Sequence, residues 1–452
     1  MLDNITRLMG MSTRAARPSR WGNTFARCRI GTLHSHIERI FFMPDERPKL
    51  RPLDIIPVQT TAGQQFLLRD SLRISNREVV ISSDTAFLLT QFDGSRTLRE
   101  AQVAYVRRFG SLITIDKITA LLHQLDEALL LDTARFHQFV EGMEAEFRAR
   151  PTRAAAHAGQ SYPDGAAAFI QTWQPRIDAA ALPEEFALAN DRPSFIAPHY
   201  TMNDAADTYA LPYALLAQVP QPDVVVILGT AHSGKGSPFI LTRKSFETPF
   251  GALDTDTTII DSLAQSAGFD VFADEFLHRD EHSIEFQTAL IHFLYREVEE
   301  PPNIVPILCG GYHRRNEGFV NPAEHDAVSQ FLDRMRTIFA SDSRRIALIA
   351  SADLSHIGAR FGQPPPLTQA HLDLVRRHDM ALLDRAMRGD AENLYFTIAE
   401  VEDRYNVCGF PCIYALARTL PIKEGRLLSY KQATEPQTQS CVSFASVGLV
   451  SG

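Results

Sequence analysis

The feature that most constrains the fold is a series of short, continuous apolar runs, each leading within a few residues to a histidine. Runs of this length, rich in valine and isoleucine, are typical of buried strands in an α/β sheet. Ligands of such sheets bind beyond the carboxyl ends of the strands, so these histidines are expected at a binding site. The runs cover residues 195–197, 224–228 and 346–350, and the histidines are His199, His232 and His356.

A cysteine and an aspartate extend this candidate site. Asp353 follows the third run, and Cys408 lies in an Asn-Val-Cys-Gly turn further along the chain. Imidazole and thiolate suit zinc, copper or iron, whereas calcium and magnesium prefer oxygen ligands. Three protein ligands with an open position are typical of a reactive metal site. A histidine after a strand is also often a plain loop residue, so the spacing alone leaves both interpretations open.

The composition of the 452-residue chain is that of a globular protein with two or three domains. The net charge of −9 argues against nucleic acid as a partner. No apolar stretch approaches the roughly 18 residues that a membrane span needs, so no membrane partner is expected. Five irregularly spaced cysteines do not suggest a disulfide framework, which favours the cytoplasm as the compartment.

The N-terminal residues 1–47 differ from the rest of the chain, because arginines far outnumber acidic residues. We interpret them as a disordered tail or as a start codon assigned too early. The composition also resembles that of a transit peptide. The charged residues of the first 40 positions are Arg7, Arg14, Arg17, Arg20, Arg27, Arg29 and Arg39, against Asp3 and Glu38.

Residues 48–135 are predicted to form a small winged-helix-like α+β domain. Thr97 and Glu100 match a capping box, in which each side chain satisfies a backbone N–H of the other residue. The helix that they begin is expected to end at Gly110. The predicted strands cover 65–68 and 78–81, and an earlier helix covers 84–92. The apolar face of a last helix comprises Ile118, Leu121, Leu122, Leu125 and Leu129.

This domain resembles the PqqD-like domains, which are winged-helix modules that bind leader peptides of ribosomally made, modified peptides. The resemblance implies a peptide or protein partner. A generic dimerisation or DNA-binding winged helix is the alternative. DNA is the weaker one, because acidic residues outnumber basic ones on the last helix. The matching residues are Leu68, Asp84, Ala86, Leu89, Phe92-Asp93-Gly94-Ser95-Arg96-Thr97 and Phe109-Gly110.

The second domain is predicted to begin at residue 153, after a helical linker over 136–152. Strand-like runs alternate here with helical patterns, which indicates a mixed or parallel sheet covered by helices. The predicted strands cover 194–197, 223–228, 303–308, 345–350 and 441–450.

Three local motifs offer other chemistries. The segment 229–235 nearly spells a phosphate-binding loop, but Gly236 replaces the hydroxyl that would hold Mg²⁺ after Lys235. His278, Glu281 and His282 fit an H-x-x-E-H zinc hydrolase, provided that the segment is helical. Cys408 and Cys412 lie ahead of a predicted helix, near whose N-terminus a cysteine pKa is depressed, and the two could form a redox disulfide.

The second domain also resembles the Memo family, called AmmeMemoRadiSam system protein B, through motifs that run in order over nearly 300 residues. The resemblance implies a fold similar to the catalytic subunit of class III extradiol dioxygenases. The matching stretches are His157–Pro163, Ile196-Ala197-Pro198-His199, Val226–His232, Glu247–Gly251, Asp280–Glu285, Val305–Leu308, Ser351–His356, Asn406-Val407-Cys408-Gly409 and Ser443-Phe444-Ala445.

Carried over by this resemblance, His199, His232 and Cys408 are the ligands of a copper or iron ion. Asp353 and His356 are implied to orient ligands or move protons, and His282 to line the same cavity. The sequence departs from the family pattern in three places beside the site: Tyr200 and Thr201 follow the first histidine, Ser233 follows the second, and Cys412 replaces a proline.

The sequence therefore predicts a Memo-like α/β domain preceded by a small winged-helix domain. The function implied is that of a metal-dependent oxidoreductase in peptide or protein modification, alongside a radical-SAM partner. Zinc is compatible with the same ligands. The alternatives are the zinc hydrolase, a non-catalytic metal-binding scaffold and an extradiol-type iron dioxygenase. The last is put in doubt because a thiolate replaces the usual carboxylate ligand.

Overall fold

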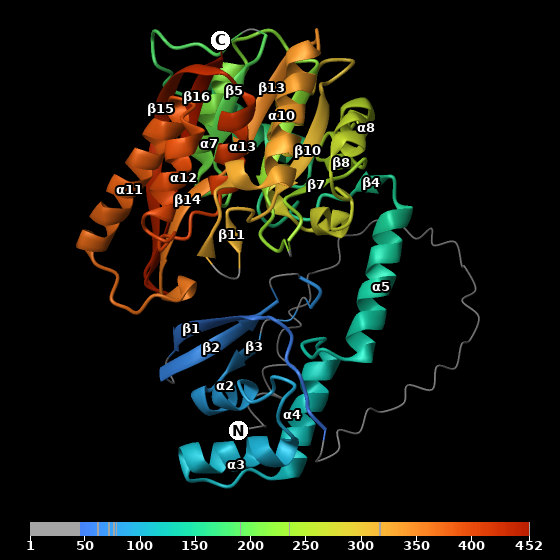
Figure 1. The fold of residues 1–452 in the computed structure, drawn as a ribbon, viewed down its shortest axis with the longest axis vertical. Helices are drawn as coiled ribbons and strands as arrows, with labels where there is room; N and C mark the ends of the chain where they lie inside the picture. Colours follow the sequence, from blue (N-terminus) through green and yellow to red (C-terminus); the bar gives the residue numbers. More distant parts are fainter. Residues whose placement is uncertain are drawn as a thin grey trace. The chain divides into compact units, whose positions relative to one another are not determined.

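The computed structural model describes residues 46–60, 63–70, 73–75, 77, 79–189, 191–234, 236–315 and 318–451 (Figure 1). The chain divides into two compact units, Met1–Met143 and Glu144–Gly452. The predicted tail lies outside the described residues up to position 45. Among the described helices, none is both long and apolar enough to cross a lipid bilayer.

The N-terminal unit joins a three-stranded antiparallel sheet to short helices. The sheet has the order β1-β2-β3, with β1 (Asp54–Thr60), β2 (Gly63–Arg69) and β3 (Val79–Ile81). The helices are α2 (Ser83–Leu89), α3 (Leu98–Phe109) and α4 (Ile115–Glu127), followed by α5 (Ala134–Ala149), which runs into the second unit.

The local signals in the sequence explain most of these boundaries. The capping box of Thr97 and Glu100 is formed, and Gly110 ends α3 with a φ of 67°. The structure corrects two details. Helix α2 ends at Leu89 rather than at residue 92, and Leu129 lies beyond the end of α4 with a φ of 58°, while the other members of its predicted face are buried. Strand β1 was not predicted.

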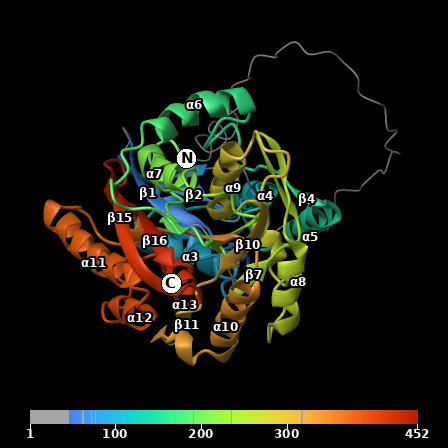
Figure 2. The same cartoon turned by 90° about the horizontal axis from the view of Figure 1, so that it is seen from above.

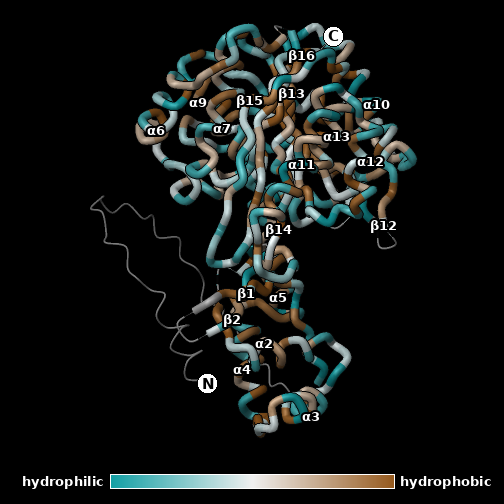
Figure 3. The backbone as a smooth tube through the Cα atoms, turned by 90° about the vertical axis from the view of Figure 1, so that its left-hand side faces the viewer, coloured by the Kyte–Doolittle hydropathy of each residue, from teal (hydrophilic) through white to brown (hydrophobic). Residues whose placement is uncertain are grey.

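The second unit is built on an eight-stranded mixed sheet with the order β14-β16-β5-β13-β6-β10-β7, in which β15 also pairs with β16. Its four central strands β5, β13, β6 and β10 run parallel to their neighbours in this group. The brown colour of the tube near β13 in Figure 3 shows that this part of the unit's interior is apolar. The strands are β5 (Ser194–Ala197), β6 (Val224–Thr230), β7 (Phe239–Leu241), β10 (Asn303–Cys309), β13 (Ile346–Ser351), β14 (Asp353–Gly358), β15 (Ile422–Glu435) and β16 (Ser440–Ser451).

Helices cover both faces of this sheet, so each central strand is buried on two sides (Figure 2). One apolar core contains side chains of α6 (Ala166–Asp178), α7 (Ala206–Leu216) and α9 (His282–Leu294). The opposite core contains side chains of α8 (Thr257–Ser266), α10 (Asp326–Ser341), α11 (Gln369–Met387), α12 (Ala391–Ala399) and α13 (Phe410–Thr419).

The strands predicted from apolar runs are all present. Four of them, β5, β6, β10 and β13, share one direction, which brings their carboxyl ends to one edge of the sheet, whereas β16 runs antiparallel to β5. His199, His232 and Asp353 each lie two residues beyond the last residue of a central strand, β5, β6 and β13 respectively. The prediction was incomplete after β13. Asp353 and His356 are not loop residues but belong to β14, and β15 was not predicted.

Candidate metal centre

His199 is fixed by the turn that follows β5. Its backbone N–H donates to Oδ1 of Asp353 (2.9 Å), and its Nδ1 lies 3.0 Å from the carbonyl oxygen of Ser351. Because a carbonyl only accepts, Nδ1 carries the proton and Nε2 carries the lone pair. Burial lowers the pKa of His199 to about 3, which keeps the imidazole neutral at pH 7. A neutral imidazole is the form that binds metals.

His232 is oriented by Glu281. Its Nδ1 lies 3.0 Å from Oε1 of the carboxylate, and its backbone N–H donates to Oε2 (3.1 Å). Burial lowers the pKa of His232, but the Glu281 carboxylate outweighs this and the net shift is upward. Burial in turn raises the pKa of Glu281, yet the neighbouring histidines hold it well below its usual value. Glu281 is therefore a carboxylate that fixes the ring of His232.

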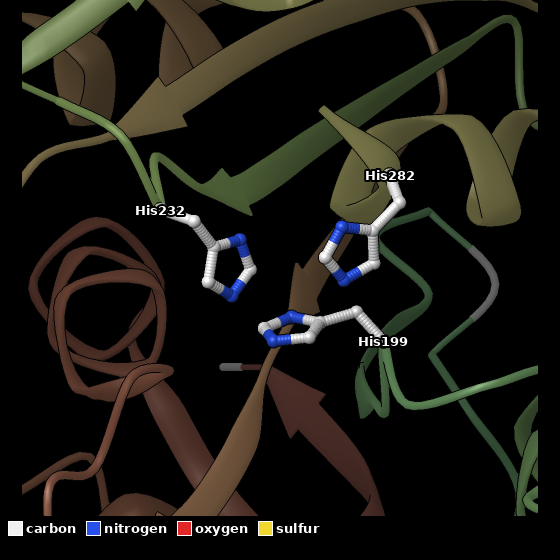
Figure 4. A group of neighbouring side chains, drawn as sticks. All are labelled: His199, His232 and His282. Atoms are coloured by element: carbon white, nitrogen blue, oxygen red, sulfur yellow. The ribbon is translucent and has the colours of Figure 1, made fainter. Parts of the chain in front are cut away.

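His282 lies on the other side of the same carboxylate, with its Nδ1 3.2 Å from Oε1 of Glu281. One nitrogen each of His199, His232 and His282 lies within 4.8 Å of the other two. The rings gather around one point in Figure 4. His199 is buried, whereas the side chains of His232 and His282 keep 34% and 30% of their surface exposed. The group is thus open to solvent on one side.

Cys408, which lies 209 residues further along the chain, contacts His199. Its Sγ lies 3.2 Å from Nε2 of His199. A Cβ on the next residue, Gly409, would lie 2.3 Å from the carbonyl oxygen of Asp353, so only glycine allows this close approach. One expectation is corrected, because burial raises the pKa of the Cys408 thiol well above its usual value. The desolvation cost outweighs the nearby start of α13.

Asp353 and His356 flank the group. Asp353 accepts the backbone N–H groups of His199 and Tyr200 through Oδ1, and its Oδ2 lies 3.7 Å from Nε2 of His199. Burial raises the pKa of Asp353 to about 6. His356 is turned back along β14, with its Nδ1 3.0 Å from the carbonyl oxygen of Leu354, and burial lowers its pKa to about 4.

Comparison with known proteins identifies the family. Residues 153–448 match the family model described as "Memo-like protein". The chain belongs to the Memo family. This match covers the whole of the candidate centre, from His199 to Cys408.

Relatives of the Memo chain come from several bacteria and archaea. A MEMO1 family protein of Aquifex aeolicus is 26% identical over 404 residues, which are 89% of this chain and 99% of the relative. A Thermus thermophilus relative is 26% identical over 78% of this chain and 99% of its own length. A Pyrococcus furiosus relative is 29% identical over 65% of this chain and 98% of its own length. The Aquifex match is longer than the Memo domain, so the similarity extends into the N-terminal unit.

The histidines of the competing H-x-x-E-H motif do not lie on one helix. His278 lies in a 3₁₀ helix (Glu275–Arg279), and α9 begins only at His282, so no helix presents both histidines on one face. His278 is buried with its Nε2 3.1 Å from the carbonyl oxygen of Ile240. Cys408 and Cys412 are free thiols. Lys235 of the near phosphate loop lies outside the described residues.

The sequence analysis did not predict the contacts that Glu281 makes in the candidate centre. Glu281 was weighed only as the general base of a hydrolase, whereas the structure shows its carboxylate between His232 and His282. The signal available was its place immediately before His282 at a predicted helix start. This position does not reveal that Glu281 contacts His232, because His232 is 49 residues away in the chain.

Proposed function

We propose that the Memo domain binds a copper or iron ion through His199, His232 and Cys408 and uses it in a redox reaction. The observation that carries this proposal is that Nδ1 of both histidines is held by a protein acceptor, while Nε2 of His199 lies beside the Cys408 thiol. Ligating histidines are held in this way in metal sites generally. The donors fit the group: neutral imidazole and thiolate suit copper, iron and zinc.

When bound, copper or iron supplies electron transfer and an open coordination position, whereas zinc has no redox chemistry. The residues around the ion have separate tasks. Asp353 holds the backbone of the His199 turn and, because burial raises its pKa to about 6, can take up or release a proton just below neutral pH. His356 orients ligands or moves protons from the β14 side.

Metal analysis after anaerobic purification tests this proposal. Wild-type protein expressed with added copper or iron is expected to retain about one ion per chain, and His199→Ala and Cys408→Ala to retain far less. Cys441→Ala is a control, because that thiol is buried and free outside the group. Equal metal in the wild type and both ligand variants would contradict the proposal.

We also propose that the N-terminal unit binds a peptide or partner protein, in a modification pathway that includes a radical-SAM enzyme. A cavity of about 520 Å³ within this unit supports binding. Its lining combines an exposed aromatic ring, Phe139, with the cations Arg77 and Arg135. Binding of a candidate peptide, measured by isothermal titration, should be lost in Phe139→Ala; unchanged affinity would contradict this use of the cavity.

A further inference from the structure

The candidate centre contains three imidazoles rather than two. We propose that His282 is a third nitrogen ligand of the metal ion, and that the single carboxylate of Glu281 holds His282 and His232 together. This inference rests on the proposed metal binding. It changes the function of His282 from lining the cavity to holding the ion.

The distances favour the three histidines as one donor set. Each of the three contributes a nitrogen within 4.8 Å of the other two. The ring centroids of His199 lie 4.9 Å from those of His232 and 5.3 Å from those of His282, and the rings cross at 83° and 89°. His232 and His282 lie 4.8 Å apart and nearly parallel. An ion between these rings therefore reaches all three.

The nitrogens that face away from this point are all occupied. Nδ1 of His199 lies against the carbonyl oxygen of Ser351, and Nδ1 of His232 and of His282 against Oε1 of Glu281. A ligating imidazole almost always donates its second N–H to a carboxylate or a carbonyl in this manner. Each ring is thus fixed in the tautomer whose Nε2 lone pair points to the metal position.

Glu281 is itself rigidly placed, which makes it suitable for aligning two ligands. It is the N-cap of α9, where its side chain accepts the backbone N–H of Ser283 (3.1 Å). Its carbonyl oxygen accepts Nη2 of the buried Arg153 (2.9 Å). Arg153 also donates from Nε to the carbonyl oxygen of His278 (2.8 Å). The backbone that carries His282 is therefore held on both sides of Glu281.

The donor set then consists of three imidazoles, with the Cys408 sulfur as a fourth donor beside His199. Three nitrogens suit Fe(II), Cu(II) and Zn(II), and a thiolate adds affinity for Cu(I). The side chains of His232 and His282 are partly exposed, so the coordination positions that these donors do not fill face solvent. A substrate would approach from that side.

Cobalt(II) is a suitable probe, because its absorption and its paramagnetic NMR shifts report the ligands directly. We would titrate the full-length apoprotein anaerobically with Co(II) and compare the wild type with His282→Ala and Glu281→Gln. His292→Ala is the matched control: it removes a buried imidazole from the same helix α9, where Nδ1 lies 2.7 Å from Oγ1 of Thr248.

The expected result is a loss of Co(II) affinity of about 10–100-fold in Glu281→Gln, as for other partners of ligating histidines, and at least as much in His282→Ala. His292→Ala should bind as the wild type does. The wild-type complex should show three exchangeable, strongly shifted imidazole N–H signals. The number of these signals is measured on the wild type, so it shows whether His282 is a ligand even if His282→Ala fails to fold.

Two results would overturn the inference, and they are distinguishable. Two shifted N–H signals in the wild type, with unchanged affinity in His282→Ala, would leave the metal centre intact and remove His282 from it. Wild-type protein that binds Co(II) no better than His199→Ala would instead overturn the proposed metal binding, and the inference with it.

Discussion

Replacing Glu285 by alanine should destabilise the Memo domain strongly, because this carboxylate is the centre of a buried polar cluster. It pairs with Nη1 of Arg153, and the two side chains are 1% and 0% exposed, respectively. It also accepts the Tyr162 hydroxyl (2.5 Å) and the backbone N–H groups of Ala156 (3.1 Å) and His157 (2.8 Å). The variant leaves the Arg153 charge buried without its counter-ion.

The expected cost is about 3–5 kcal/mol, which is what removing one partner of a buried ion pair typically costs. An exposed pair provides the comparison. Arg148 and Glu144 on α5 have side chains 68% and 38% exposed, and breaking such a pair costs at most about 1 kcal/mol. The loss in the free energy of unfolding should therefore be several-fold larger for Glu285→Ala than for Glu144→Ala.

Urea unfolding followed by circular dichroism measures this difference. With a slope near 3 kcal/mol per M, the midpoint of Glu285→Ala should fall by about 1 M or more. The pH dependence gives a second check. Burial raises the pKa of Glu285, but Arg153 and the other partners outweigh it, so the folded-state pKa lies below the usual 4.5.

This carboxylate therefore contributes stability above pH 4.5 and loses it as the pH falls through its folded-state pKa. The gap between the wild type and Glu285→Ala should narrow in acid. Equal unfolding midpoints for Glu285→Ala and Glu144→Ala at pH 7, or a gap that does not change with pH, would refute the reasoning.

Three further variants test other parts of the structure. Asp379 is buried among hydroxyls and its pKa is raised to about 6 from 3.8, so the wild type should lose up to about 3 kcal/mol between pH 4 and pH 7 relative to Asp379→Asn; parallel pH profiles from urea unfolding would contradict this. Gly409→Ala should cost about 1–3 kcal/mol by overpacking and also lower metal affinity, because it displaces Cys408; wild-type affinity by chelator competition would contradict this. Thr97→Ala should cost about 1 kcal/mol in thermal unfolding of the N-terminal unit by removing the capping box; no change would show that the cap contributes little.

The sequence was most informative where a local pattern has one structural solution. Continuous apolar runs predict the central strands, and the rule that parallel strands end at one edge places His199, His232 and Asp353 together from the sequence alone. Strand β15 was missed because its side chains are mostly half-buried or exposed, so its residues carry no continuous apolar run.

The arrangement within the centre depended on tertiary contacts that no local pattern encodes. Glu281 contacts His232 across 49 residues, and nothing in its neighbourhood in the sequence shows this. The same holds for Cys408. Its position beside a helix start predicted a lowered pKa, whereas its burial in the folded chain raises it. The burial of individual side chains and the contacts between residues far apart in the sequence are therefore seen only in the structure.

Anomalous diffraction from a crystal of the copper-loaded protein, recorded at the copper absorption edge, tests the central claim most directly. We expect one strong peak bounded by Nε2 of His199, Nε2 of His232 and Sγ of Cys408, and absent from crystals of His199→Ala. Copper located elsewhere in the Memo domain, or no ordered copper at all, would contradict the account.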